Sequence, residues 1–340
     1  MNYFEYLKKL KNDFLKKYRR FVGFVIVPIL LLILVALTIF IVITRVHPKN
    51  DARTDEEKFA EHVQQEKERD KLIEDYRSVV DSSDYIIHAL GGMHKEKCYI
   101  NSIDTLDTTY QAGYRLFEAD ISFTSDDVLV LAHSGENNVW SENDWKLRLG
   151  QEIPNNVDNK RLCTFDQFMS FKIQGEYQAT SLAGLFDYME VHKDMYVMVD
   201  AGNRSYEDTL KYYTELVKVA DGREDILNRL IAGGQTTEMV RAARQAYDFP
   251  LINLYYDKDE KREKELATPE KFVEYCHKND IISYSVAKEV YTEEVGKVLG
   301  DSDLIGYVFT VNDKQEASHL RSIGADVIGT DYLWDEKETN

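Results

Sequence analysis

The segment "GYRLFEADISFTSDDVLVLAHSG", residues 113–135, combines residue types that can do chemistry. An apolar run carries Glu118 and Asp120 two positions apart, a short turn follows, and a second apolar run ends at His133. Residues two apart in a strand point to the same face, so the two carboxylates lie side by side. Because buried charges are unfavourable unless they are paired or bind a metal, the pattern predicts a cation between them.

Further ionisable residues end other apolar runs. His88 follows "YII" and Asp200 follows "YVMV". If these runs are parallel strands, their carboxyl ends meet at one edge and bring the two histidines and three carboxylates together. Three carboxylates favour a hard cation, Ca²⁺ or Mg²⁺. Two histidines beside it suit general acid–base catalysis near neutral pH.

The elements that must position these groups are short apolar runs separated by helical patterns. The runs cover residues 85–90, 114–123, 128–133, 196–202, 229–234, 250–256, 281–286, 304–312 and 326–330. Only the turn at residues 124–127 is too short for a helix, and it predicts a hairpin. Repeated strand–helix units predict an α/β fold with a parallel sheet, and their number favours a (β/α)8 TIM barrel. An open doubly wound sheet is the alternative, but the chain has no glycine-rich phosphate loop to support it.

The N-terminal region predicts a membrane anchor. Residues 1–20 form a basic tail with seven Lys or Arg, and residues 21–44 hold 24 residues without a charge. At ~1.5 Å per residue this stretch spans a bilayer, and it is longer than the apolar part of a signal peptide. We expect a transmembrane helix over residues 21–45 in the cell membrane, with a cytoplasmic N-terminus and an extracellular domain.

The remaining chain divides into a linker and a domain. Residues 46–83 are rich in Glu, Lys and Gln and predict a helical stalk whose last turns pack on the domain. A coiled-coil dimer is the alternative, although the heptad pattern does not persist. Residues 84–340 form the predicted barrel.

The charge distribution restricts the function. The net charge is −18, and nine of the 42 basic residues lie in residues 1–50, so the remainder is strongly acidic. This excludes nucleic-acid binding by the domain, which requires a basic surface. The three cysteines lie far apart and show no zinc-binding or disulfide spacing.

The motifs resemble those of a known family. "HALGG…YINSIDTLDTTYQAGYRLFEADISFTSDDVLVLAHSG" resembles the N-terminal signature of glycerophosphodiester phosphodiesterases and the related phosphatidylinositol-specific phospholipase C-like barrel enzymes. "YVFTVND…LRSIGADVIGTDYL" resembles their C-terminal signature. The resemblance covers residues 85–333 in order.

The resemblance implies metal-dependent cleavage of a phosphodiester substrate. His88 and His133 would be the acid–base pair, and Glu118, Asp120 and Asp200 would hold one divalent cation. Asn101 would cap the first barrel helix and lie near the phosphate. The substrates would be glycerophosphodiesters, lipid headgroups or teichoic-acid-like polymers of the cell envelope.

Several positions depart from the family pattern. Ala89 stands where the family has an arginine that grips phosphate, and Gly202 stands where it has a lysine. Ser134 and Phe309 replace an aspartate and a tryptophan, and Arg204 is the nearest replacement cation in the sequence. Two functions therefore stay open: an active phosphodiesterase, and a catalytically weak or inactive barrel that binds a phosphodiester or a partner at the envelope.

Overall fold

The computed structural model describes residues 54–93, 97–135, 139–153, 162–202, 204–258, 263–264 and 266–335. The predicted tail and transmembrane segment lie outside these residues. Within the described part of the chain, no helix is long and apolar enough to cross a membrane. The chain divides into two compact units, residues 1–66 and 67–340. The described residues of the first unit, 54–66, contain the start of helix α3 (Asp55–Asp81).

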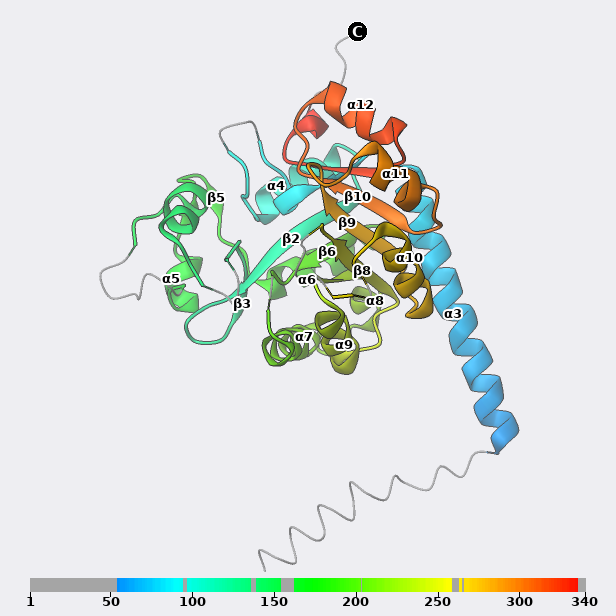
Figure 1. Ribbon diagram of the computed structural model, residues 1–340. Helices are drawn as coiled ribbons and strands as arrows, with labels where there is room; N and C mark the ends of the chain where they lie inside the picture. Colours follow the sequence, from blue (N-terminus) through cyan, green and yellow to red (C-terminus); the bar gives the residue numbers. More distant parts are fainter. Residues whose placement is uncertain are drawn as a thin grey trace, which may run out of the picture. The chain divides into compact units, whose positions relative to one another are not determined.

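A closed barrel of parallel strands forms the centre of the second unit (Figure 1). In chain order, the strands are β1 (Tyr85–Ile87), β2 (Leu116–Phe123), β6 (Tyr196–Asp200), β7 (Leu230–Gly234), β8 (Leu251–Tyr256), β9 (Ser283–Ala287), β10 (Ile305–Phe309) and β11 (Val327–Thr330). Each pairs with its neighbours in the order β1-β11-β10-β9-β8-β7-β6-β2, and β2 pairs back to β1 through Phe117 and Ile87. The predicted TIM barrel is confirmed, and the open sheet is wrong.

Helices surround the strands because their apolar faces pack on the outward-facing strand residues. They are α4 (Ile103–Gln111), α6 (Leu182–Val191), α7 (Tyr206–Ala220), α8 (Glu224–Leu227), α9 (Thr237–Ala246), α10 (Pro269–Lys278), α11 (Glu293–Gly300) and α12 (Lys314–Ser322). All but α8 begin after a Ser, Thr or Asp whose side chain accepts a backbone N–H of the first turn. Such caps fix where each helix starts, and so where each preceding loop ends.

An insertion separates β2 from α6. It contains β3 (Leu129–Leu131), the π-helix η4 (Asp144–Leu149), α5 (Phe165–Met169), β4 (Lys172–Ile173) and β5 (Tyr177–Gln178). β3 runs antiparallel to β2, which confirms the predicted hairpin. Trp140, Trp145 and Phe168 are buried in a small hydrophobic core of the insertion. This core holds the insertion beside the carboxyl end of β2.

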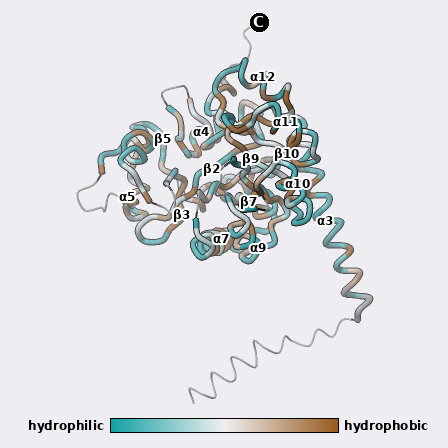
Figure 2. Tube along the Cα trace, viewed as in Figure 1, coloured by the Kyte–Doolittle hydropathy of each residue, from teal (hydrophilic) through white to brown (hydrophobic). Residues whose placement is uncertain are grey.

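The last turns of α3 close the amino-terminal end of the barrel. Most of α3 is hydrophilic (Figure 2). Tyr76 is nonetheless fully buried, and it packs with Leu116, Tyr196 and other residues at the starts of the strands. Its hydroxyl group also forms a hydrogen bond with that of Tyr307. The opposite, carboxyl end is therefore the accessible mouth of the barrel.

Candidate active site

The chain turns sharply at the end of β1 and places His88 at the mouth. His88, Ala89 and Leu90 form a 3₁₀ turn (η2), and Gly91 has a φ of 108°, which favours glycine. The Gly92 N–H donates to the Asp331 carbonyl at 2.7 Å. A Cβ at Gly92 would lie 3.1 Å from that carbonyl oxygen. The two glycines thus let the end of β11 approach the end of β1.

This approach gives His88 a carboxylate partner. The Nδ1 atom of His88 lies 2.7 Å from Oδ1 of Asp331, whose other oxygen accepts from Asn312 at 2.6 Å. The Nε2 atom faces Glu118, with Oε2 at 3.8 Å. Burial lowers the pKa of His88, but the hydrogen bond to Asp331 and the nearby carboxylate charges outweigh it and raise the pKa to about 10.

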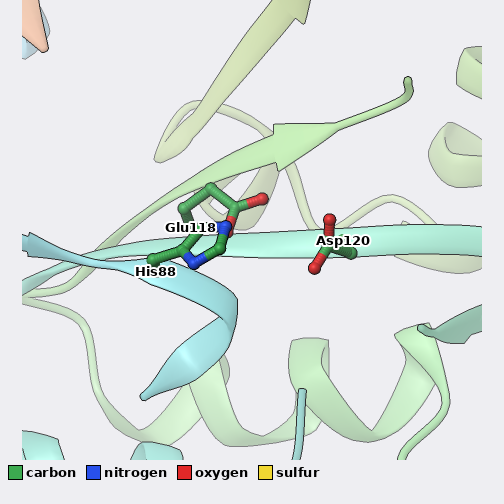
Figure 3. Close-up of side chains that lie close together, drawn as sticks. All are labelled: His88, Glu118 and Asp120. Carbon is green, nitrogen blue, oxygen red and sulfur yellow. The ribbon is translucent and has the colours of Figure 1, made fainter. Parts of the chain in front are cut away.

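Glu118 and Asp120 lie beside this histidine on β2. Figure 3 shows the imidazole next to the Glu118 carboxylate, with Asp120 further along the strand. One ligand atom from each of the three side chains lies within 4.8 Å of the others. Ala119 points outward into the core under the helices, as the alternation predicts. Burial and the charge of Asp120 raise the pKa of Glu118 well above its usual value.

Both carboxylates on β2 are held by hydrogen bonds. Oε2 of Glu118 accepts the Ala89 N–H at 2.8 Å. Oδ2 of Asp120 accepts from Asn101 Nδ2 at 2.8 Å, and its backbone N–H donates to Asn101 Oδ1 at 3.0 Å. Fixed carboxylates of this kind are the usual surroundings of a bound metal ion.

Asp200 is the third predicted metal ligand. It pairs in register with Asp120 across β6 and β2, and its Oδ1 accepts the Gly202 N–H at 2.6 Å. Burial and the charge of Asp120 raise its pKa. The group whose ligand atoms lie within 4.8 Å consists of His88, Glu118 and Asp120, so Asp200 is adjacent to it rather than part of it.

His133 follows β3 and also has a carboxylate partner. Its Nδ1 lies 3.3 Å from Oδ1 of Asp144, the first residue of η4. Asp144 accepts the Ser141 N–H at 2.7 Å and contacts the Arg148 guanidinium. Burial lowers the pKa of His133, but the bond to Asp144 and the charge of Asp120 raise it overall.

Tyr99 lies between the two histidines. Its ring centroid is 4.8 Å from that of His88 and 5.8 Å from that of His133, edge to face in both cases. The Arg148 guanidinium lies 4.8 Å from the centre of the Tyr99 ring. The insertion thereby brings a cation next to the ring that lies between the two histidines.

Two adjoining cavities open at this mouth. The larger, of about 400 Å³, is bounded by His88 and Glu118 and extends into the barrel lumen. The smaller, of about 230 Å³, is bounded by Asp120 and His133. They share Asp200, Gly202 and Gln235. A ligand that spans both cavities would place its central group at the carboxylates.

The structure changes the interpretation of two predicted residues. Asn101 does not cap α4, because Ser102 does so by accepting the Asp104 N–H. Asn101 has a φ of 50°, which turns its amide toward Asp120 instead.

Arg204 is 6% exposed and is absent from the residues that line the two cavities. Its guanidinium lies 5.2 Å from the centre of the Tyr212 ring, and Nη2 donates to the Ile121 carbonyl at 3.4 Å. This packing keeps the guanidinium out of the two cavities, and its charge opposes the rise in the pKa of Asp200.

The sequence prediction did not include Asp331, Asp144, Tyr99 or Arg148 as site residues. Asp331 directly follows the apolar run of β11, so the rule that found His88 and Asp200 also applies to it. Asp144 carries no such signal, because it lies in an irregular insertion eleven residues after its histidine.

Comparisons with known proteins identify the family of the chain. The model of the glycerophosphoryl diester phosphodiesterase family matches residues 92–334. No curated protein sequence is significantly similar to the chain.

Similar folds occur among solved structures of glycerophosphodiester phosphodiesterases. The Parabacteroides distasonis enzyme is 15% identical, with a TM-score of 0.53 and coverage of 73% of this chain and 93% of that one. The Thermotoga maritima enzyme is 17% identical, with a TM-score of 0.51 and coverage of 73% and 94%. An Oleispira antarctica phosphodiesterase in complex with the product sn-glycerol-3-phosphate is 13% identical, with a TM-score of 0.54 and coverage of 74% and 94%. Because the family model spans most of the barrel, the chain belongs to the glycerophosphoryl diester phosphodiesterase family of phosphoric diester hydrolases.

Proposed function

We propose that the barrel hydrolyses phosphodiesters with His88 and His133 as its proton-transferring pair and with a divalent cation. The observation that carries the proposal is that each histidine binds its own carboxylate through Nδ1, at 2.7 Å for His88 and 3.3 Å for His133. Such bonds orient an imidazole and leave its other nitrogen for proton transfer. One histidine would accept the proton of the attacking hydroxyl group, and the other would protonate the leaving oxygen.

The residues fit a divalent cation. Glu118 and Asp120 are both buried and lie close together, and Asp200 adjoins them where the two cavities meet. Oxygen ligands of this kind suit Ca²⁺ or Mg²⁺. A bound cation would withdraw charge from the phosphate oxygens. Because carboxylate charges raise the pKa of His88, neutralising them would return it toward the range in which histidine exchanges protons.

A cation for the phosphate is needed because Ala89 and Gly202 replace the family's arginine and lysine. We propose Arg148 for this role in place of Arg204. Neither arginine lines the two cavities, but the Arg148 side chain is 27% exposed and its guanidinium lies beside the Tyr99 ring that separates the histidines. Planar guanidinium groups bind phosphate oxygens in pairs. If Arg148 remains bound to Asp144 instead, the barrel would be a catalytically weak binder of phosphodiesters.

The substrates follow from the location that we propose. Residues 21–45 would form a single transmembrane helix, with the barrel outside the cell, as the uncharged stretch and the basic tail suggest. There the barrel would meet glycerophosphodiesters, lipid headgroups and teichoic-acid-like polymers. The product complex of the Oleispira antarctica phosphodiesterase supports a glycerol-containing substrate.

The test is hydrolysis of glycerophosphocholine, lysophospholipid and purified teichoic acid by the full chain, with Ca²⁺, Mg²⁺ or EDTA. We expect cation-dependent release of a phosphomonoester or a cyclic phosphate from at least one substrate. His88→Ala and His133→Ala should each lower this activity by about 100-fold or more. His277→Ala is the matched control. His277 lies in the last turn of α10, pairs with Asp303 on the surface and lines neither cavity. Absence of hydrolysis under all conditions would favour the binding role.

A further inference from the structure

The barrel lumen is incompletely filled near its mouth. Bulky residues from the strands usually fill the interior of a TIM barrel. Here Gly233, Ser285 and Gly329 line the lumen and contribute little or no side chain. The resulting cavity of about 400 Å³ falls within the range of small-molecule sites, roughly 300–1,000 Å³. It therefore has room for a part of the substrate beyond the phosphate.

One wall of this cavity carries a polar group without a partner. Asn253 on β8 is 2% exposed and pairs in register with Gly233. Its Nδ2 donates to Ser285 Oγ at 2.8 Å. Among the described residues, its Oδ1 has no hydrogen-bond partner. A buried polar atom in this state is unfavourable, and filling the cavity with a matching group would relieve it.

We propose that Asn253 and Ser285 bind a hydroxyl group of the substrate's alcohol. These two residues would therefore determine which alcohol the site accepts, and the inference rests on the proposed phosphodiesterase function. If the Asn253 amide were rotated by 180°, its nitrogen would face the cavity instead of its oxygen. A hydroxyl group matches either orientation, because it both donates and accepts. The quaternary ammonium group of choline has no N–H to donate and no lone pair to accept with, and it finds no charge on this pair.

The two cavities give the substrate a direction. The alcohol that Asn253 recognises occupies the lumen cavity, whose lining includes His88 and Glu118. The phosphate lies where the cavities meet, at Asp200. The second substituent then extends into the smaller cavity beside His133. The lumen cavity therefore selects the alcohol, while the smaller cavity admits varied leaving groups.

The experiment uses p-nitrophenyl phosphodiesters of glycerol, propane-1,2-diol and choline, which share one leaving group. The glycerol and propane-1,2-diol esters both keep a hydroxyl group next to the ester carbon and differ only in the terminal hydroxyl. We expect kcat/KM to favour the glycerol ester over the propane-1,2-diol ester by about 10- to 100-fold. Asn253→Leu should bring this ratio close to one, and Ser285→Ala should lower it partly.

Ser283→Ala is the matched control. Ser283 lies two residues earlier on β9, is buried, and donates to the Ile252 carbonyl without lining the cavity. It should keep the wild-type ratio. A ratio that Asn253→Leu leaves unchanged, or a wild-type preference for the choline ester, would overturn the inference.

If no ester is hydrolysed, the proposed function fails and binding decides the inference separately. Calorimetric titration with glycerol 3-phosphate and propane-1,2-diol 1-phosphate, in the presence of Ca²⁺, compares the same two alcohols without turnover. Tighter binding of glycerol 3-phosphate that Asn253→Leu removes would support hydroxyl recognition. Equal binding of the two phosphates, or no binding of either, would contradict it.

Discussion

Replacing Glu118 by Gln and Asp120 by Asn should remove a repulsion without changing the shape of the site. One ligand atom of each carboxylate lies within 4.8 Å of the other. With an effective dielectric constant of ~20, two unit charges at that distance repel by about 3 kcal/mol. Without a cation, burial and this repulsion both favour the protonated form of Glu118, whose pKa is raised.

The raised pKa fixes the sign of the pH dependence. The folded state binds the Glu118 proton more tightly than the unfolded state, whose carboxyl pKa is about 4.3. The free energy of unfolding in EDTA should therefore fall as the pH rises from that value through the folded-state pKa of Glu118. The double variant lacks the proton-binding group and should show a smaller fall. In EDTA it should be no less stable than the wild type.

Added cation should raise the Tm of the wild type but not that of the Glu118 and Asp120 double variant. A cation at 100 times its Kd stabilises the folded state by about 2.7 kcal/mol. For a domain of this size that corresponds to about 5–10 °C in Tm. The assay is thermal unfolding of the full chain in detergent with EDTA, Ca²⁺ or Mg²⁺. Glu293→Gln with Glu294→Gln, exposed in the first turn of α11, is the charge-matched control and should keep the rise. An equal rise in the Glu118 and Asp120 variant would show that the cation binds elsewhere.

Four further outcomes are expected. His88→Ala and His133→Ala should each lower kcat by about 100-fold or more on the best substrate, and survival of turnover would refute the acid–base assignment. Asp144→Asn removes a carboxylate charge that raises the pKa of His133, so one limb of the pH–rate profile should move to lower pH; an unchanged profile would separate His133 from catalysis. Arg148→Ala should lower kcat/KM by about 10- to 100-fold and Arg148→Lys by less, whereas equal losses would indicate a structural role. Protease added outside intact cells or protoplasts should cleave or release the barrel, and full protection would refute the proposed orientation.

The fold was predictable because its strands are buried on both faces. Such strands read as short apolar runs, and the nine runs in the sequence correspond to β1, β2, β3 and β6 to β11. The insertion was not predictable in the same way. Its elements are short, and its core depends on burying Trp140 and Trp145 together, which no local period encodes.

From the sequence, only the site residues on or directly after strands could be predicted. The rule that polar residues end barrel strands placed His88, Glu118, Asp120 and Asp200 around one mouth, where the structure also has them. Side-chain direction in the loops depends on tertiary contacts instead. The positive φ of Asn101 turns its amide away from the helix that follows it in the sequence.

The missing arginine and the insertion belong to one arrangement. Ala89 is fully buried, and its N–H holds Glu118, so this position orients a carboxylate rather than facing the phosphate. The cation must then come from another part of the chain, and η4 supplies Arg148 together with Asp144, the partner of His133. The short helix η4 would thus provide both the positive charge that the turn at Ala89 lacks and the carboxylate that orients His133. We therefore infer that substitutions which loosen the core around Trp145 would impair His133 and phosphate binding together, although Trp145 is buried away from both cavities.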